Sequence, residues 1–236
     1  MIVARGLAKS YGSVAVLRGL NLEIARGRVT AIVGPNGAGK TTFIKALLGL
    51  TRPDAGILTF DGVAIGDDAA YRARIGYMPQ IAHFPENLTG TELLALLRDL
   101  RGAGSLDERL IDQLGLRDAV DKKLRVLSGG TRQKVNAVAA FLFAPDLYVL
   151  DEPTSGLDPV SSGILKQRIL AERVAERTII LTSHILSEID ELADDVVFLD
   201  EGQVRFAGGV SELKRETGQT TIERAIAALM IRQAAA

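Results

Sequence analysis

The chain of 236 residues contains no cysteine, no tryptophan and only two histidines, His83 and His184. The absence of cysteine excludes disulfides and thiolate metal sites, and it fits a reducing compartment. Two histidines are too few for a histidine cluster that would bind a transition metal. Because no chemical motif surrounds His83, we predict that it is a surface residue.

The sequence also lacks long apolar runs and a strong net charge of either sign. Its most apolar neighbourhood, 135–150, is interrupted by Asn136, Pro145 and Asp146 and is too short to cross a bilayer. The first residues, MIVARGLAKSYG, contain no apolar core of signal-peptide length, so secretion is not expected. The formal net charge is -1, which gives no positive field that would attract nucleic acid. We therefore expect no nucleic-acid partner and only a peripheral role at any membrane.

The stretch 29–42, VTAIVGPNGAGKTT, joins an apolar run typical of a buried strand to a glycine-rich turn. It fits G-x-x-x-x-G-K-[ST], which predicts a phosphate-binding loop that leads into a helix. The glycines let successive backbone N–H groups point at an anion, and the helix start adds its positive dipole end. Lys40 would reach the β- and γ-phosphates, and the Thr41 hydroxyl would bind Mg²⁺. The predicted nucleotide-binding residues of this loop are Gly34, Pro35, Asn36, Gly37, Ala38, Gly39, Lys40, Thr41 and Thr42.

Carboxylates follow a second apolar run. Residues 147–150 precede Asp151 and Glu152, as expected for a buried parallel strand that delivers acidic side chains to the ligand-binding edge of a sheet. Another apolar run, 178–182, ends beside His184. These residues are therefore expected at the edge of the sheet where ligands bind.

Three further polar positions are candidate contacts to a nucleotide. Gln80 directly follows a short predicted strand. Tyr11 lies in an early turn, where it either stacks on a purine base or is a half-buried packing residue. Ser128 and the two glycines after it open a helix, which predicts either a second anion site or a simple N-cap.

Periodicity and turn residues predict an α/β fold in which antiparallel strands lie beside a parallel core. The segment of about 79–127 is mainly helical, and we interpret it as an insert. Strands are predicted at 2–7, 21–24, 57–63, 147–150, 178–182, 196–199 and 203–206, and helices at 41–50, 91–100, 106–114, 160–174 and 221–230.

In their order and over essentially the whole chain, these motifs resemble the nucleotide-binding subunit of an ATP-binding cassette (ABC) transporter. The motifs are the Tyr11 turn, GPNGAGKTT, Gln80, LSGGT at 127–131, LYVLDE at 147–152, SGLD at 155–158 and His184. A phosphate loop alone leaves kinases, GTPases and motor ATPases open, whereas LSGGT, the Asp-Glu pair and the later histidine together favour the ABC family. No N-K-x-D guanine-reading motif is present.

The resemblance implies a P-loop NTPase of ABC type, formed as a single domain by residues 1–236. A mainly parallel RecA-like core with an antiparallel β subdomain would comprise 1–78 and 128–210. An α-helical subdomain would comprise about 79–127, and 211–236 would form a C-terminal helix and tail.

The resemblance also implies an ATPase that uses ATP and Mg²⁺. Glu152 would orient or deprotonate the attacking water. Asp151 would hold Mg²⁺ together with Thr41 and Gln80, and Gln80 would also sense the γ-phosphate. His184 would bond the γ-phosphate and steady the geometry about Glu152.

Members of the family dimerise head to tail, so a second nucleotide-binding subunit is expected, most simply in a homodimer. Ser128, Gly129 and Gly130 of one copy would clamp ATP held by the phosphate loop of the other, and Asp158 would lie at the interface. The family signature usually ends in glutamine, whereas this chain has Thr131. Because Ser128 and both glycines are retained, we expect ATPase activity.

A lone cassette implies a separate transmembrane permease and a cytoplasmic position on the inner face of the cell membrane. The sequence between the shared motifs resembles the ATPase of the copper-maturation transporter for nitrous oxide reductase, with multidrug and other exporters as its nearest rivals. The alternative is a soluble ABC ATPase of metal-cluster assembly or another non-transport process. An inactive scaffold is disfavoured because Lys40, Asp151, Glu152 and His184 are intact.

Overall fold

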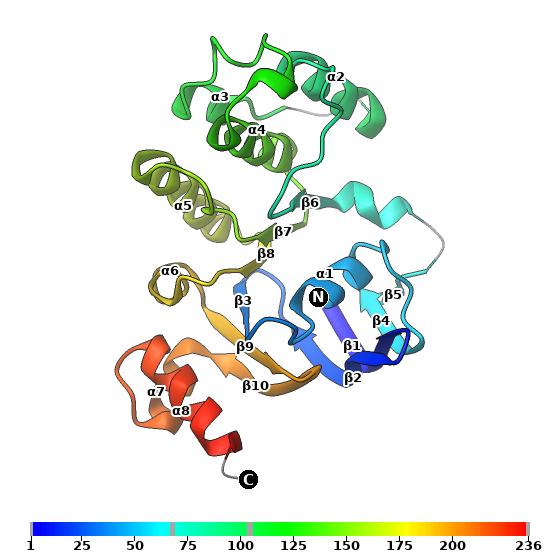
Figure 1. Cartoon of the computed structure of the whole chain (residues 1–236), viewed down its shortest axis with the longest axis vertical. Coiled ribbons are helices and arrows are strands. Elements are labelled where there is room, and N and C mark those ends of the chain that lie inside the picture. The colour runs from blue at the N-terminus through cyan, green and yellow to red at the C-terminus, as the bar shows by residue number, and fades with distance from the viewer. Residues whose placement is uncertain (1, 67–68, 103–105, 235–236) are drawn as a thin grey trace.

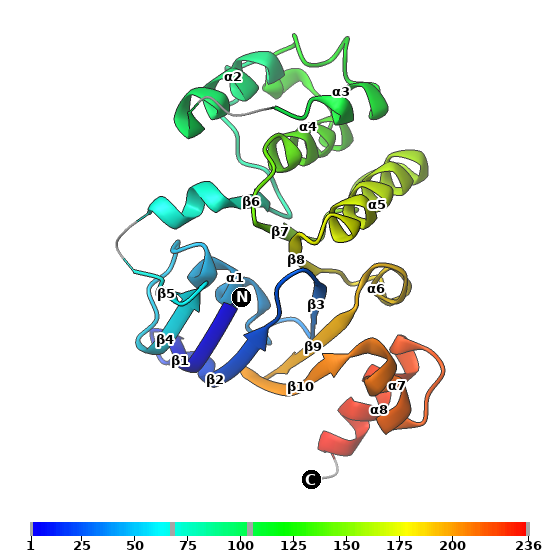
Figure 2. The same ribbon diagram turned by 180° about the vertical axis from the view of Figure 1, so that it is seen from behind.

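The computed structural model describes residues 2–66, 69–102 and 106–234 and contains two β-sheets, the larger of which is flanked by helices (Figures 1 and 2). The end of the predicted tail lies outside these residues. In both views, helices α2, α3 and α4 gather at one end of the molecule and α7 and α8 lie at the other. The α-helices are α1 (Lys40–Leu47), α2 (Gly90–Arg101), α3 (Arg109–Gln113), α4 (Gly129–Phe141), α5 (Pro159–Val174), α6 (Leu186–Leu192), α7 (Val210–Thr217) and α8 (Ile222–Ala234).

The larger sheet has the strand order β10-β9-β3-β8-β7-β6 and is parallel except for β10. Every residue of β3, β7 and β8 is buried, because other elements cover both faces of the sheet. The predicted mainly parallel α/β core is confirmed. Its strands are β3 (Val29–Val33), β6 (Ile75–Met78), β7 (Leu147–Asp151), β8 (Thr178–Thr182), β9 (Asp195–Asp200) and β10 (Gln203–Gly209).

The smaller sheet is antiparallel and has the order β2-β1-β4-β5, which confirms the predicted antiparallel strands. Its first two strands were predicted too short, at 2–7 and 21–24, because their pairing continues through several register shifts. These irregularities break the regular alternation that the sequence would otherwise display. The strands are β1 (Ile2–Tyr11), β2 (Val14–Ile24), β4 (Ala55–Phe60) and β5 (Val63–Ala64).

Side chains of β3 alternate between two hydrophobic clusters, as expected for a strand that is buried on both faces. Val29, Ala31 and Val33 belong to the cluster that includes residues of helices α2 to α8. Ile32 belongs to the opposite cluster, which includes Phe43 of α1 and the inner face of the smaller sheet. The loop after β3 therefore leaves a strand that is packed from both sides.

Helices α6 and α7 were missed by the sequence prediction. They have only 7 and 8 residues, too few for a clear helical period, and α7 is mostly polar (VSELKRET). The predicted helix 106–114 is also shorter than expected, because α3 begins at Arg109. Among the described residues, no helix combines the length and apolar character needed to cross a bilayer.

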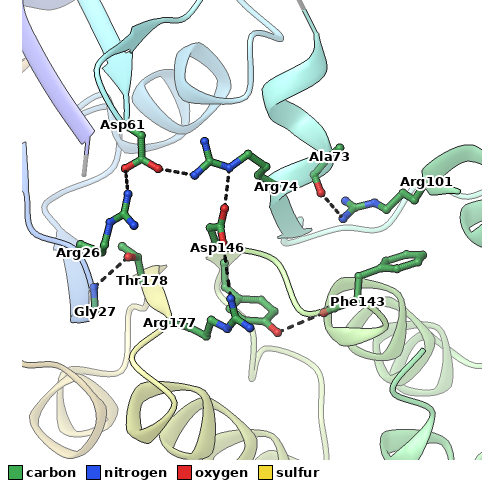
Figure 3. Close-up of polar contacts among 11 residues, drawn as sticks. Arg26, Gly27, Asp61, Ala73, Arg74, Arg101, Phe143, Asp146, Arg177 and Thr178 are labelled. Carbon is green, nitrogen blue, oxygen red and sulfur yellow. Dashed lines mark hydrogen bonds and ion pairs between the residues drawn. The ribbon is translucent and has the colours of Figure 1, made fainter. Parts of the chain in front are cut away.

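A chain of charged side chains joins the two sheets at the amino ends of β6, β7 and β8 (Figure 3). Asp61, in the turn between β4 and β5, accepts hydrogen bonds from Arg26 and Arg74. Arg74 Nε also donates to Asp146 Oδ2 at 2.6 Å, and Arg177 lies 3.6 Å from Asp146. These ion pairs thus hold the smaller sheet against the larger one at the amino ends of the larger sheet's strands.

Asp107 connects α3 with α5. Its carboxylate accepts hydrogen bonds from Arg109 Nε at 2.8 Å and from Arg168 Nη1 of α5 at 2.6 Å. The hydrogen bond from Arg109, opposed by desolvation and supported by Arg168, holds the pKa of Asp107 well below its usual range. Because the Arg168 side chain is only 9% exposed, solvent screens this pair poorly.

We expect Asp107→Asn to lower the free energy of unfolding by about 2 kcal/mol near neutral pH, the scale of hydrogen bonds to charged groups. A carboxyl whose pKa is lowered on folding stabilises fully above its unfolded pKa of about 3.9, and this stabilisation is lost as the pH falls through the folded pKa. Urea unfolding of both proteins from about pH 7 to about pH 3 measures the difference. The difference should stay constant above the unfolded pKa and begin to shrink below it, and a difference as large at about pH 3 as at about pH 7 would exclude the charge of Asp107 as its cause.

Candidate active site

The phosphate loop predicted from the sequence connects β3 to α1 at the carboxyl edge of the larger sheet. Gly34, Gly37 and Gly39 have φ angles of 151°, 82° and 103°, which residues with a β-carbon rarely adopt. A Cβ on Gly34 would lie 2.0 Å from the carbonyl oxygen of Leu199. Only glycine fits this close approach, so the conformation of the loop requires glycine at position 34.

Lys40 folds back across the loop at the start of α1. Its Nζ donates hydrogen bonds to the carbonyl oxygens of Gly34 at 2.7 Å and Pro35 at 3.1 Å. Burial lowers the pKa of Lys40, and the nearby charges of Glu152 and Asp151 oppose this shift. The ammonium group is therefore held over the loop, close to two carboxylates.

Asp151 and Glu152 follow each other at the end of β7, where Thr182 at the end of the neighbouring β8 contacts both. The Thr182 hydroxyl donates to Asp151 Oδ1 at 2.5 Å and accepts from the Glu152 N–H at 3.0 Å. The sequence analysis missed Thr182, although its position at the end of the apolar run 178–182 was a usable signal. This hydroxyl orients the Asp151 carboxylate, which is only 7% exposed.

The side chains of Glu152 and His184 contact each other, with 2.7 Å between Glu152 Oε1 and His184 Nε2. Glu152 has a φ of 49°, a left-handed conformation that is unusual for a residue with a β-carbon. Such strain costs about 1–3 kcal/mol and persists only where surrounding contacts fix it. The structure thus places a carboxylate beside an imidazole on two loops that are far apart in the sequence.

These residues line one cleft of about 470 Å³. Thr41, Gln80 and Asp151 supply a hydroxyl, an amide and a carboxylate to it, and oxygen donors of this kind suit Mg²⁺, which usually takes few protein ligands beside phosphate and water. Within the described ranges, no group of three or more histidine, aspartate or glutamate side chains forms a metal site. The cleft is lined by Val14, Val16, Asn36, Gly37, Ala38, Gly39, Lys40, Thr41, Thr42, Gln80, Asp151, Glu152 and His184.

Tyr11 lies in the hairpin between β1 and β2 and does not line this cleft. Its side chain is 49% exposed, and its hydroxyl lies 3.2 Å from the hydroxyl of Thr51. Val14 and Val16 of β2 line the cleft beside the phosphate loop. The stacking of Tyr11 on a base stays a prediction. The other histidine, His83, is exposed, as predicted for a surface residue.

The tip of α4 does not line the phosphate cleft either. Ser128 is the N-cap of α4: its Oγ accepts from the Thr131 N–H at 3.1 Å and lies 2.8 Å from the Thr131 hydroxyl. Gly129 lines a different cleft of about 850 Å³ that also includes Gln80. Thr131 therefore contacts Ser128 within the same helical turn.

Asp158 has contacts within its own chain. It caps α5 through hydrogen bonds from the Ser161 N–H at 2.9 Å and the Ser161 hydroxyl at 2.7 Å. Lys134 of α4 lies 3.0 Å from the same carboxylate, and these contacts to Ser161 and Lys134 lower the pKa of Asp158. Asp158 thereby connects α5 to the helix that begins at Ser128.

A glycine-rich loop between a buried parallel strand and a helix, with Asp151 and Glu152 on the next-but-one strand, defines a P-loop NTPase. The antiparallel sheet beside the core narrows the class to an ATP-binding cassette. Comparisons with known proteins identify the family.

A family model described as ABC transporter matches residues 17–155. The daunorubicin/doxorubicin resistance ATP-binding protein DrrA of Streptomyces peucetius is 39% identical over 227 residues, which is 94% of this chain and 69% of that protein. The Nod factor export ATP-binding protein I of Ralstonia nicotianae is 34% identical over 230 residues, 94% of this chain and 72% of that protein. The solved structure of an ATP-binding subunit of an ABC transporter has a TM-score of 0.91 at 30% identity and covers 98% of this chain and 99% of that one. The chain therefore belongs to the ABC transporter family, as an ATP-binding subunit with ATPase activity, which confirms the resemblance found in the sequence.

Proposed function

We propose that this chain hydrolyses ATP to drive a separate transmembrane permease in an export system. The observation that carries the proposal is that Lys40, Asp151, Glu152 and His184 line the same cleft. The direction of transport is inferred from relatives, because DrrA is a resistance protein and the Nod factor protein acts in export.

The residues of the cleft suit phosphoryl transfer to water. Lys40 would exchange its two carbonyl hydrogen bonds for phosphate oxygens, and Glu152 would accept the proton of the attacking water as the bond to ADP breaks. Thr41, Gln80 and Asp151 would hold Mg²⁺, which neutralises charge on the β- and γ-phosphate oxygens when bound.

The position of α4 supports a head-to-tail dimer as part of this proposal. Ser128, Gly129 and Gly130 do not line the cleft of their own chain, but the free N–H groups of a helix tip suit an anion. In the dimer they would bind the γ-phosphate of ATP held by the partner copy, and Asp158 would lie near the interface. Loss of the γ-phosphate on hydrolysis would remove these contacts and favour dissociation.

The helical subdomain of about 79–127 is the proposed region of contact with the permease, at the cytoplasmic face of the membrane. The cleft of about 850 Å³ that contains Gln80 opens beside this subdomain. A role in the copper maturation of nitrous oxide reductase stays a prediction, because the ATPase subunit would not contact the cargo.

The proposal is tested by expressing the chain with and without a candidate multi-spanning permease from the same genome. We expect the chain to sediment with membranes, and to copurify in detergent, only when that protein is present. Release of the chain by high salt alone, together with a stable complex with soluble assembly factors, would favour the non-transport alternative.

A further inference from the structure

A buried carboxylate, that of Glu188, is hydrogen-bonded to a residue near Glu152 and to the residue before His184. Glu188 belongs to α6, one helical turn beyond His184, and is only 9% exposed. Its Oε2 accepts a hydrogen bond from the Thr154 hydroxyl at 2.8 Å and a second from the Ser183 hydroxyl at 3.3 Å. Thr154 is itself buried, with 8% exposed.

The two hydroxyls come from the two loops that carry the proposed catalytic side chains. Thr154 lies two residues after Glu152, and Ser183 directly precedes His184. In addition to the bond from the Glu152 N–H to Thr182, the loops are thus joined by Glu152 and His184 at the cleft and by the buried carboxylate of Glu188. Because His184 is 54% exposed, the buried connection is the less screened of the two.

The backbone of Glu152 needs such a connection. Its left-handed φ of 49° is unfavourable and must be imposed by neighbouring contacts. Within the loop, the Ser155 N–H donates to the Glu152 carbonyl at 3.1 Å and the Leu157 N–H donates to the Thr154 carbonyl at 3.2 Å. These bonds shape the turn, whereas the bond from Thr154 to Glu188 fixes the turn relative to α6.

We infer that Glu188 is a positioning residue for ATP hydrolysis. It acts through Thr154 and Ser183 to fix the position of Glu152 relative to His184. The inference rests on the proposed roles of Glu152 and His184. A general base must lie within hydrogen-bond reach of its water, and a displacement of about 1 Å can reduce the rate about 100-fold. Glu188 should therefore affect kcat and leave the affinity for ATP, which depends on the phosphate loop, almost unchanged.

The main test compares Glu188→Ala with Glu188→Gln in steady-state ATP hydrolysis. Glu188→Ala removes the acceptor and should lower kcat at least about tenfold, with KM changed less than about threefold. Both hydrogen bonds enter one oxygen, so the amide oxygen of Glu188→Gln can accept them and should keep kcat within about threefold of wild type. A merely structural Glu188 would not give this split between kcat and KM.

A second pair of variants tests the same connection if Glu188→Ala fails to fold. Thr154→Val keeps the side-chain shape but removes the donor and should lower kcat about fivefold or more, whereas Thr154→Ser keeps the hydroxyl and should restore it. Thr217→Val is the matched control, because this buried hydroxyl donates to the Leu213 carbonyl at 2.8 Å in α7, outside the cleft.

Equal losses in Thr154→Val and Thr217→Val would overturn the inference, as would Glu188→Ala with kcat within about twofold of wild type. A fall in ATP affinity as large as the fall in kcat would also overturn it. The proposed function fails separately, if Glu152→Gln hydrolyses ATP normally. If Glu152→Gln is inactive while the Glu188 and Thr154 variants are fully active, only the positioning role is wrong.

Discussion

Replacing Glu152 with Gln is expected to lower kcat for ATP hydrolysis at least about 100-fold while ATP still binds, because general-base catalysis contributes about 10²–10⁴. The amide has nearly the same shape and can still contact His184, but it cannot accept a proton from water. ATP should therefore persist between two copies, and the variant should form a stable dimer in Mg-ATP. Phosphate release at saturating ATP, ATP binding and size-exclusion chromatography measure the three effects.

Glu176→Gln is the matched control for this variant. Glu176 has the same residue type and a similar left-handed backbone, with φ of 58°, but it lies exposed at the amino end of β8 and not in the cleft. The Glu176→Gln variant should hydrolyse ATP like wild type. Undiminished hydrolysis by Glu152→Gln would remove Glu152 from its proposed role.

Replacing Lys40 with Ala is expected to raise the Kd for ATP at least about tenfold, the scale of one charge-assisted hydrogen bond to phosphate. Lys40 is held over the phosphate loop by the carbonyls of Gly34 and Pro35, so its ammonium group needs little reorganisation to reach a phosphate. Because the burial that lowers the pKa of Lys40 also excludes solvent, the contact should be poorly screened.

Equilibrium binding of a fluorescent ATP analogue measures this effect. Lys45→Ala is the control, because Lys45 lies on the exposed side of the same helix, outside the cleft, and should leave the Kd within about twofold. An unchanged Kd in Lys40→Ala would show that the loop does not bind phosphate in the proposed way.

Much of the cleft was predictable because polar residues follow apolar runs at 147–150 and 178–182. Parallel strands end at one edge of the sheet, so Asp151, Glu152 and His184 were expected to meet the phosphate loop there. The glycine pattern predicted the loop itself, since few other local structures require glycine at these spacings.

The contacts that support these residues were not predictable from the sequence. Thr182 reaches Asp151 only because β8 lies beside β7, and the order of strands in a sheet is set by tertiary packing. The bond from Thr154 to Glu188 depends on α6, a helix too short to show a periodic pattern. The contact between Thr131 and Ser128 was also not predicted, because the sequence did not determine the side-chain partner of Thr131.

The two ends of the strands in the larger sheet differ in function. The nucleotide cleft lies at their carboxyl ends, and the ion pairs from Asp61 to Arg177 lie at their amino ends. Helix α5 runs from the carboxyl ends of the strands back to their amino ends, so Val174 at the end of the helix is remote from the cleft. Val174 is 85% exposed. Since the chain has no cysteine of its own, Val174→Cys would provide a unique thiol. A dye or surface tether attached there would report on the ATPase without obstructing nucleotide entry.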